Sequence, residues 1–397
     1  MALSLALMAS VVAVPTLASD TAVDGIYYDF DESSLTASVT YRGAEDDWMY
    51  DATGSTLYVG DIVIPPTVVY GGRTYTVTAI GNDAFIGSRQ MTGLALPHTV
   101  TSIGTGIFTA CTSLRSITVD EANPVFLSSD RVLYRRSPLA FVFAPRAISG
   151  NVELPDAIGD LPASAFQNCT LLETIVVPDA VTQIGEAAFS GCTSLTDITI
   201  GSGVTSIGRS AFQGCTALGV VSVPSSVASI GHAAFYGCTG LTYLILNEGL
   251  RTIDSWAFYG CTQIAALMLP STLTSVGDKA FYGCTSLKTI LNRSSLDLTP
   301  GSESNGFLAY YATTVDNVDP TSVAHAAPPT PFAVRNVGSR AIAVSGLAGG
   351  RLQVFDIAGR RVHSSVPAAP THTIVLPQAG VYIVVSGARR CRVAVGR

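Results

Sequence analysis

Apolar and polar residues alternate in one frame that recurs every 23 residues. In residues 184–206, IGEAAFSGCTSLTDITIGSGVTS, the apolar Leu195, Ile198 and Ile200 alternate with the polar Asp197 and Thr199. A period of two is typical of a strand with one buried face. The next three units repeat the frame I-G-x-x-A-F-x-G-C-T-x-L-x-x-I-x-V-P. The pattern therefore predicts one short strand per repeat, with successive strands forming a parallel sheet.

Each repeat also carries a phenylalanine and, three residues later, a cysteine. The phenylalanines are Phe85, Phe108, Phe166, Phe189, Phe212, Phe235, Phe258 and Phe281; the cysteines are Cys111, Cys169, Cys192, Cys215, Cys238, Cys261 and Cys284, with Ser88 in place of the first. A fixed period in the twenties indicates a solenoid, because a unit this small must stack on a neighbour to bury its apolar face.

The A-F-x-G-C segment is expected to form an irregular or 3₁₀-like turn that directs the phenylalanine inward. The residue before the cysteine is Gly or Asn in nearly every copy, which predicts a left-handed backbone there. Ala110 departs from this rule, so we expect a strained or differently turned rung at that position.

Seven cysteines in one frame allow three interpretations. We expect a column of buried, unbonded thiols, because every copy points the same way in its rung and the number is odd. Partial disulfides and a metal site are the alternatives, although no C-x-x-C spacing or paired histidine supports a metal. Cys391 lies outside the column, and its redox state is not predictable.

The frame, with its L-x-x-I-x-V strand, resembles the BspA-like class of leucine-rich repeat over residues 76–291. The resemblance implies an α/β-type solenoid of strands and irregular or 3₁₀ turns at residues 76–318, with an insertion at about 123–145 and a degenerate closing repeat at 292–318. It also implies a bacterial surface protein. Ligand identity does not follow from the fold.

The segments before and after the array suggest further parts. Residues 1–18 resemble a signal peptide, with a short buried strand as the alternative. Residues 19–75 alternate as strands, with Gly71 and Gly72 as a hairpin signal, and are expected to form an amino-terminal β cap. Residues 319–332 are rich in Pro and Ala, which predicts a linker.

Residues 333–397 differ in charge from the rest of the chain. They carry nine arginines and one acid, Asp356, for a net charge of +8, whereas the whole chain is at −7. They resemble the carboxy-terminal sorting domain of the type IX secretion system, a small all-β sandwich. The matching residues are Val354, Phe355, Asp356, Gly359, Arg360, Leu376, Gly380 and Tyr382. The alternative is a small β-sandwich that binds a ligand.

The sequence offers little for catalysis. The five histidines are scattered, and no H-E-x-x-H, G-x-S-x-G or phosphate-binding glycine loop is found in a suitable context. We therefore expect no enzyme activity, no cofactor and no metal. The net negative charge argues against nucleic acid, and no apolar run is long enough for a membrane-spanning helix.

Two columns of residues are candidates for ligand contact. Outward positions of the strands turn apolar towards the carboxy end, at Val220, Tyr243, Ile245 and Met268. A second column, Tyr236, Tyr259 and Tyr282, occupies the x of A-F-x-G-C, where the alternatives are stacking between rungs and ligand contact.

The sequence thus predicts a non-enzymatic, exported surface protein of a Gram-negative bacterium, secreted or held at the outer membrane. It is expected to bind a protein or glycan ligand on a host or neighbouring cell in an adhesin-like role, and to meet the outer-membrane secretion machinery through its tail. The alternatives are a self-assembling surface-layer protein and, more remotely, a hydrolase.

Overall fold

The computed structural model describes residues 22–41 and 58–317, together with residues 333–338, 341–345, 352–356, 361–365, 371–376, 380–386 and 389–395. The chain forms two compact units, Met1–Pro320 and Thr321–Arg397, which are described separately. The expected signal peptide and linker, and the motif residues Gly359 and Arg360, lie outside the described residues.

The amino-terminal part of the first unit is a β-sheet. Strands β1 (Ala22–Val23), β2 (Ile26–Asp31), β3 (Thr36–Thr40), β5 (Thr67–Tyr70) and β6 (Arg73–Ile80) form one sheet in the order β1-β2-β3-β6-β5. Gly71 and Gly72, with φ of 57° and 75°, make the tight turn between β5 and β6, which confirms the expected hairpin. β6 also pairs in parallel with β8 (Ser102–Ile103), so the cap continues into the array.

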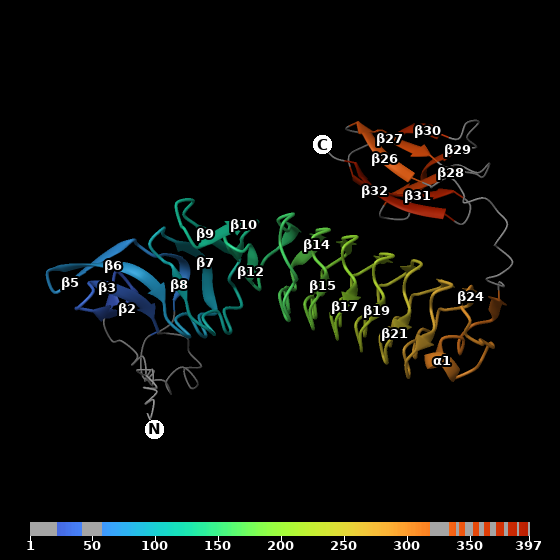
Figure 1. Cartoon of the computed structure of the whole chain (residues 1–397), viewed down its shortest axis with the longest axis horizontal. Coiled ribbons are helices and arrows are strands. Elements are labelled where there is room, and N and C mark those ends of the chain that lie inside the picture. The colour runs from blue at the N-terminus through green and yellow to red at the C-terminus, as the bar shows by residue number, and fades with distance from the viewer. Residues whose placement is uncertain are drawn as a thin grey trace, which may run out of the picture. The chain divides into compact units, whose positions relative to one another are not determined.

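The strands of the array form parallel ladders along one side of the unit (Figure 1). β4 (Val59–Val63), β7 (Gln90–Leu96) and β9 (Ser116–Val119) form the first. The second comprises β13 (Gly150–Glu153), β14 (Leu172–Val177), β16 (Asp197–Ile200), β18 (Val220–Val223) and β20 (Tyr243–Leu246). β22 (Ala266–Leu269), β24 (Thr289–Asn292) and β25 (Thr314–Asn317) form the third. In β16, β18, β20, β22 and β24 the buried and outward residues alternate as the sequence predicts.

Five repeats carry a second, two-residue strand in addition. These strands are β15 (Gln183–Ile184), β17 (Ser206–Ile207), β19 (Ser229–Ile230), β21 (Thr252–Ile253) and β23 (Ser275–Val276), and they form their own parallel ladder. Two residues are too few for a periodic pattern, so the alternation did not predict them. These rungs are thus hydrogen-bonded to their neighbours along two ladders rather than one.

The turn between the short and long strands places the phenylalanine in the core. In the turn that ends at Cys192, the Cys192 N–H donates to the carbonyl of Phe189, three residues earlier, at 3.2 Å. The Phe189 N–H donates to the carbonyl of Ala211 on the next rung at 2.7 Å. The rings from Phe166 to Phe281 stack face to face with centroids 4.9–5.4 Å apart. The turn is therefore stabilised by a hydrogen bond within it and by a hydrogen bond to the next rung.

The left-handed position before each cysteine is confirmed in every copy. The φ of Gly214 is 71° and that of Asn168 is 61°. Ala110 adopts the same conformation at 61°, so its rung is turned like the others, and the strain falls on a residue with a Cβ atom. A second left-handed residue occurs two positions before each phenylalanine, as at Trp256 and Lys279, where the sequence shows no glycine.

The insertion is a three-stranded antiparallel sheet that joins two hydrophobic cores. Its strands are β10 (Phe126–Ser129), β11 (Val132–Arg135) and β12 (Ala140–Phe143). Leu133 packs into the core of the amino-terminal rungs, whereas Val132 and Tyr134 pack into the core of the later rungs. Phe143 lies 4.4 Å from Phe108, and Phe141 lies 5.5 Å from Phe166, as ring centroids. Aromatic side chains of the insertion therefore continue the stack where the repeat frame is interrupted.

The array closes at residues 292–317. A four-residue turn, α1 (Ser304–Phe307), in which Asn305 and Gly306 have positive φ, contacts β23. The Phe281 N–H donates to the Gly306 carbonyl at 2.8 Å. β25 then pairs in parallel with β24. Among the described residues α1 is the one helix, so the solenoid is built almost entirely of strands and turns.

The second unit consists of antiparallel strands. β26 (Ala333–Gly338), β27 (Ala341–Ser345) and β30 (Thr371–Val375) form one sheet in that order. The other sheet has the order β29-β28-β31-β32 and comprises β28 (Leu352–Asp356), β29 (Arg361–Ser365), β31 (Gly380–Ser386) and β32 (Arg389–Val395). Val354, Ile374 and Leu376 are buried.

Candidate binding surfaces of the repeat array

The outward residues of β18, β20 and β22 form the apolar part of the strand face. Tyr243 is 49% exposed and Met268 is 39% exposed, while Val220 and Ile245 are half-buried. Their neighbours in the same strands, such as Val221 and Leu244, are buried. The strand geometry therefore directs the predicted side chains away from the core, as alternation along a strand requires.

Strand pairing brings these residues together within β18 and β20 and within β22 and β24, and β20 contacts β22 without being paired to it. Val220 lies opposite Tyr243, and Met268 lies opposite Leu291 of β24. Leu291 is half-buried and extends the apolar surface by one rung. The repeat frame decays after this residue, so the pattern did not indicate it. We call Val220, Tyr243, Ile245, Met268 and Leu291 the strand-face patch.

Polar residues border the strand-face patch. Asp316 lies opposite Leu291 on the closing strand and is exposed. Beyond the carboxyl ends of the strands, Arg293 Nη1 lies 3.3 Å from Glu248 Oε1, in a partly exposed ion pair. An apolar centre with a charged margin is the usual composition of a protein-binding surface.

The tyrosine column lies in a different segment of each repeat, the turn before the strand. Tyr236 and Tyr259 stack with centroids 4.9 Å apart and planes 8° apart, and Tyr259 and Tyr282 stack at 5.3 Å and 27°. Phe307 meets Tyr282 edge-on at 5.1 Å. Stacking between rungs, one of the two alternatives, is therefore present. It covers the ring faces that a sugar would need.

Trp256 adds to this aromatic surface. Its ring lies 5.3 Å from that of Tyr259 and 6.1 Å from that of Tyr236. Lys279 Nζ lies 5.9 Å from its centroid, a cation–π distance. His232 lies 6.3 Å away. Trp256 is itself the second left-handed residue of its rung, and the repeat frame did not indicate this conformation.

The seven thiols of the array are buried and unbonded to one another, as expected. Cys192 Sγ lies 3.1 Å from the carbonyl oxygen of Phe166, 26 residues earlier, to which it donates, and four later cysteines repeat this contact. Burial raises the pKa of Cys238 and Cys284 to about 12, so these thiols stay protonated at neutral pH. Buried thiols of high pKa are poor nucleophiles.

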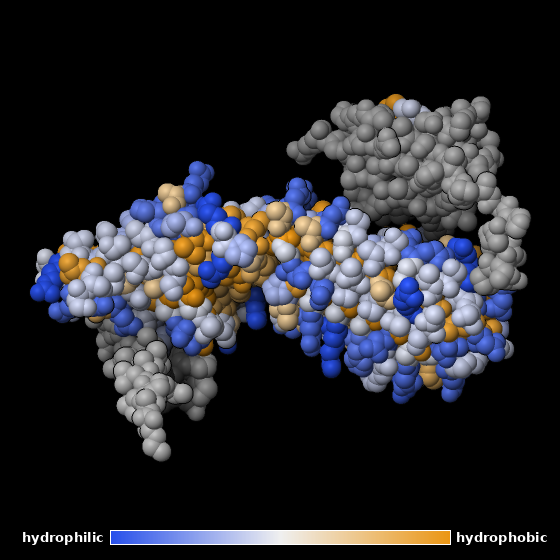
Figure 2. All heavy atoms as spheres, in the orientation of Figure 1, coloured by the Kyte–Doolittle hydropathy of each residue, from blue (hydrophilic) through white to orange (hydrophobic). Residues whose placement is uncertain are grey.

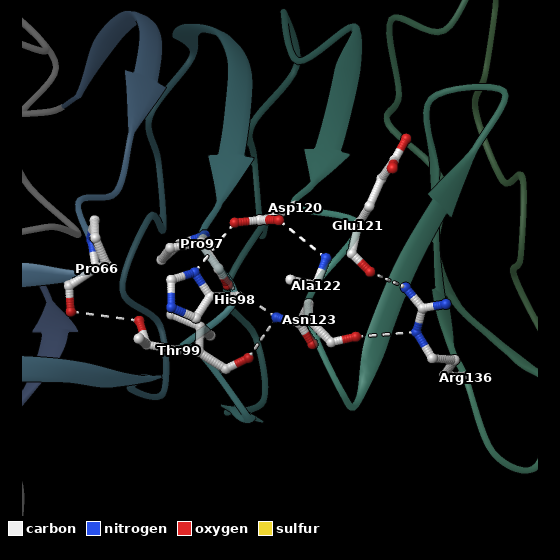
Figure 3. Close-up of polar contacts among 10 residues, drawn as sticks. Pro66, Pro97, His98, Thr99, Asp120, Glu121, Ala122, Asn123 and Arg136 are labelled. Atoms are coloured by element: carbon white, nitrogen blue, oxygen red, sulfur yellow. Dashed lines mark hydrogen bonds and ion pairs between the residues drawn. The ribbon is translucent and has the colours of Figure 1, made fainter.

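One cluster contains residue types found in active sites. His98 Nδ1 lies 3.1 Å from Asp120 Oδ2, and Arg136 lies nearby (Figure 3). The backbone N–H of Ala122 and the side chain of His98 together lower the pKa of Asp120. The Thr99 hydroxyl donates to the Pro66 carbonyl at 3.4 Å rather than to His98.

The centre of this cluster is structural. Asn123 is 1% exposed, and its Nδ2 donates to the carbonyls of Pro97 and Val100 at 2.9 and 2.8 Å (Figure 3). Its Oδ1 accepts hydrogen bonds from two backbone N–H groups, those of Val125 and Phe126. Arg136 donates to the carbonyl of Asn123. These contacts fasten the insertion to the preceding rung.

Residues 22–41, 58–317 and the tail strands contain no group of His, Cys, Asp or Glu side chains arranged for a metal ion. In the same residues no helix is both long and apolar enough to cross a membrane.

In the tail, the motif residues fall on neighbouring strands. Val354, Phe355 and Asp356 lie in β28, whereas Gly380 and Tyr382 lie in β31. Asp356 pairs with Tyr382 across the two strands. Leu376 is buried beyond the end of β30.

Comparison with known proteins identifies the repeat. The BspA type leucine rich repeat region matches in six copies, over residues 74–129, 140–228 and 216–302. No curated protein matches the chain.

Solved structures with a similar fold include three leucine-rich repeat proteins. That from Eubacterium ventriosum is 23% identical, with a TM-score of 0.46, over 62% of this chain and 68% of its own. The protein from Bacteroides ovatus is 19% identical, with a TM-score of 0.39, and the match covers 76% of this chain and 100% of that protein. A leucine rich cell surface protein from Faecalibacterium prausnitzii is 20% identical, with a TM-score of 0.37, and the match covers 75% of this chain and 94% of that protein. Since the repeat matches cover more than half of the residues, this chain belongs to the BspA-type leucine-rich repeat family.

Proposed function

We propose that this protein is a non-enzymatic surface protein that binds a protein ligand of a host or neighbouring cell through the strand-face patch. The observation that supports this most directly is the apolar cluster on β18, β20, β22 and β24, in which Tyr243 and Met268 are exposed. Large apolar side chains gathered on a regular surface are typical of an interaction site.

The rigidity of the array favours tight binding. Every strand of the patch is fixed by backbone pairing, as in the full register between Val220–Val223 and Tyr243–Leu246. A surface that is already ordered loses little conformational entropy when a ligand binds. Glycan binding is the weaker alternative, because the tyrosine rings that could stack on sugars are stacked on each other.

The test is binding of the purified full chain to immobilised extracellular-matrix proteins and, in parallel, to a glycan array. The variant Tyr243→Ala/Ile245→Ser/Met268→Ser removes the centre of the patch. We expect saturable binding to a matrix protein that the variant weakens by at least about thirtyfold, as for a central hot spot.

A matched control changes the same column on the two earlier rungs: Val176→Ser/Thr199→Ala. These residues are exposed in parallel positions, so this variant should bind like the native protein. Equal loss in both variants, or equal binding by all three proteins, would contradict the proposal. Concentration-dependent self-association that the first variant abolishes would instead assign the patch to assembly of a surface layer.

We further propose that the tail is a sorting domain that directs the protein across the outer membrane of a Gram-negative bacterium. Support comes from the pairing of Asp356 with Tyr382, which places the two resembling motifs side by side, and from the basic charge of residues 333–397. A reporter fused to residues 321–397 should reach the surface of a bacterium with that machinery. Export that persists after Asp356→Ala/Tyr382→Ala would count against this role.

A further inference from the structure

The outer edge of β12 is open. In the sheet β10-β11-β12 it is the last strand, and its backbone pairs with β11 alone. No backbone hydrogen bond joins Ala140–Phe143 to any other segment among the residues that the structure describes. An unpaired strand edge presents a row of N–H and C=O groups that can accept another strand.

The side chains of β12 are apolar and only half covered. All four residues, Ala140–Phe143, are half-buried, although Phe141 and Phe143 each pack against a ring of the array. Figure 2 shows an apolar patch on the part of the array where Figure 1 places β12. Edge strands are usually protected by a charged residue or proline, and β12 contains neither.

Arginines are concentrated in the segment that contains this edge. Residues 123–146 carry four arginines, Arg131, Arg135, Arg136 and Arg146, against one acid, Asp130. They stand in an otherwise acidic array. None of these arginines lies within 4.0 Å of a carboxylate in the described part of the chain. Arg131 and Arg136 donate to backbone carbonyls, and the exposed Arg135 lies over the ring of Phe126 on β10, 5.6 Å from its centroid.

The charges lie beside both ends of the strand. Arg135 is exposed and pairs with Ala140 at the start of β12, and Arg146 follows three residues after its end. Antiparallel pairing of two β12 strands would bring the start of one next to the end of the other, and so would set arginine against arginine. Charge therefore disfavours a second copy of this chain and favours an acidic strand.

We propose that β12 is a strand-addition site for an extended segment of a partner protein in which apolar residues alternate with aspartate and glutamate. The backbone of the segment would extend the sheet β10-β11-β12. Its apolar side chains would cover Phe141, and its carboxylates, on the opposite face of the sheet, would meet Arg135 and Arg146. This surface lies on the insertion and is separate from the strand-face patch.

The experiment measures binding of a fluorescent nine-residue peptide, Asp-Val-Glu-Val-Thr-Val-Glu-Val-Asp, to the full chain by anisotropy at low salt. Two control peptides carry lysine in place of each acid, or N-methyl groups on alternate backbone nitrogens. We expect saturable binding of the acidic peptide and none of either control, because the first reverses the charge and the second removes the hydrogen bonds of the ladder.

Protein variants locate the site. Arg135→Glu should weaken binding by roughly three- to tenfold, and less so at high salt, where exposed charges are screened. Arg209→Glu, an exposed arginine on a later rung, is the matched control and should bind like the native chain. The Tyr243→Ala/Ile245→Ser/Met268→Ser variant should also keep its affinity for the peptide, which separates this proposal from the proposed function.

Other results would overturn the proposal. These are equal binding of the acidic and lysine peptides, no effect of N-methylation, no binding of the acidic peptide, or equal loss in the two arginine variants. Concentration-dependent dimerisation that Val142→Lys abolishes, with circular dichroism unchanged, would assign the edge to a second copy and would equally overturn it.

Discussion

The left-handed position before each cysteine gives a quantitative test of the repeat geometry. Gly214 has a φ of 71°, and a Cβ atom added there would meet no heavy atom within 4 Å. The cost of Gly214→Ala is therefore conformational alone. Forcing a residue with a Cβ atom into this region destabilises the folded state by about 1–2 kcal/mol. Alanine also lowers the conformational entropy of the unfolded chain, which stabilises the folded state by about 0.4–1 kcal/mol.

We expect Gly214→Ala to lower the free energy of unfolding by about 0.5–1 kcal/mol. Gly219, five residues later, also has open space around its Cα but no positive φ. Gly219→Ala should therefore raise the free energy of unfolding by about 0.4–1 kcal/mol. At Ala110, with a φ of 61°, the change to glycine should stabilise by about 0.5–1 kcal/mol, since the strain is relieved.

The assay is urea unfolding of the full chain followed by circular dichroism, with the midpoint compared at unchanged m-value. The difference in sign between Gly214→Ala and Gly219→Ala carries the test. If both alanines shift the midpoint in the same direction by the same amount, the left-handed backbone before the cysteine is not what selects glycine there.

Three further outcomes are expected. Burial raises the pKa of Cys111, Cys169, Cys238 and Cys284 from 9.0 to about 12, so stability should be constant below about pH 9 and fall as the pH rises towards 12. Urea midpoints across this range should fall less steeply in a Cys238→Ala variant, and an identical slope would contradict the burial argument. Phe235→Ala removes a ring stacked on both sides, at 4.9 and 5.1 Å, and should cost about 3–5 kcal/mol in the same assay, whereas a loss below 1 kcal/mol would be inconsistent with the stack. Asn123→Ala leaves two buried carbonyls and two N–H groups without their partner and should cost about 2–3 kcal/mol, with Asn151→Ala, at an exposed strand position, as the control.

The buried columns of the solenoid were predictable because the same residue type fills the same place in each rung. Phe189 and Cys192 needed no long-range information, since their neighbours are copies of themselves. The outward direction of Tyr243 and Met268 followed from alternation alone.

The parts that escaped prediction depend on contacts outside the frame. Phe141 and Phe143 complete the aromatic stack from an insertion whose sequence shows no copy of A-F-x-G-C. Trp256 reaches the tyrosine column through a left-handed backbone at a residue type that gives no sign of one. Leu291 joins the strand-face patch because β25 closes the array beside it, which a decaying pattern did not reveal.

The spacing of the hydrogen bonds has a consequence for how such a chain can change in length. Contacts between rungs join residues about one repeat apart, as in the Thr205 hydroxyl that donates to the Thr182 carbonyl 23 residues earlier. Deletion of residues 208–230 would join Ile207 to Gly231 and leave Phe189 beside Phe235, a pair equivalent to the one lost. Loss or duplication of whole units should thus shorten or lengthen the display surface without new packing, whereas loss of a few residues inside a unit would misalign the rung that contains them.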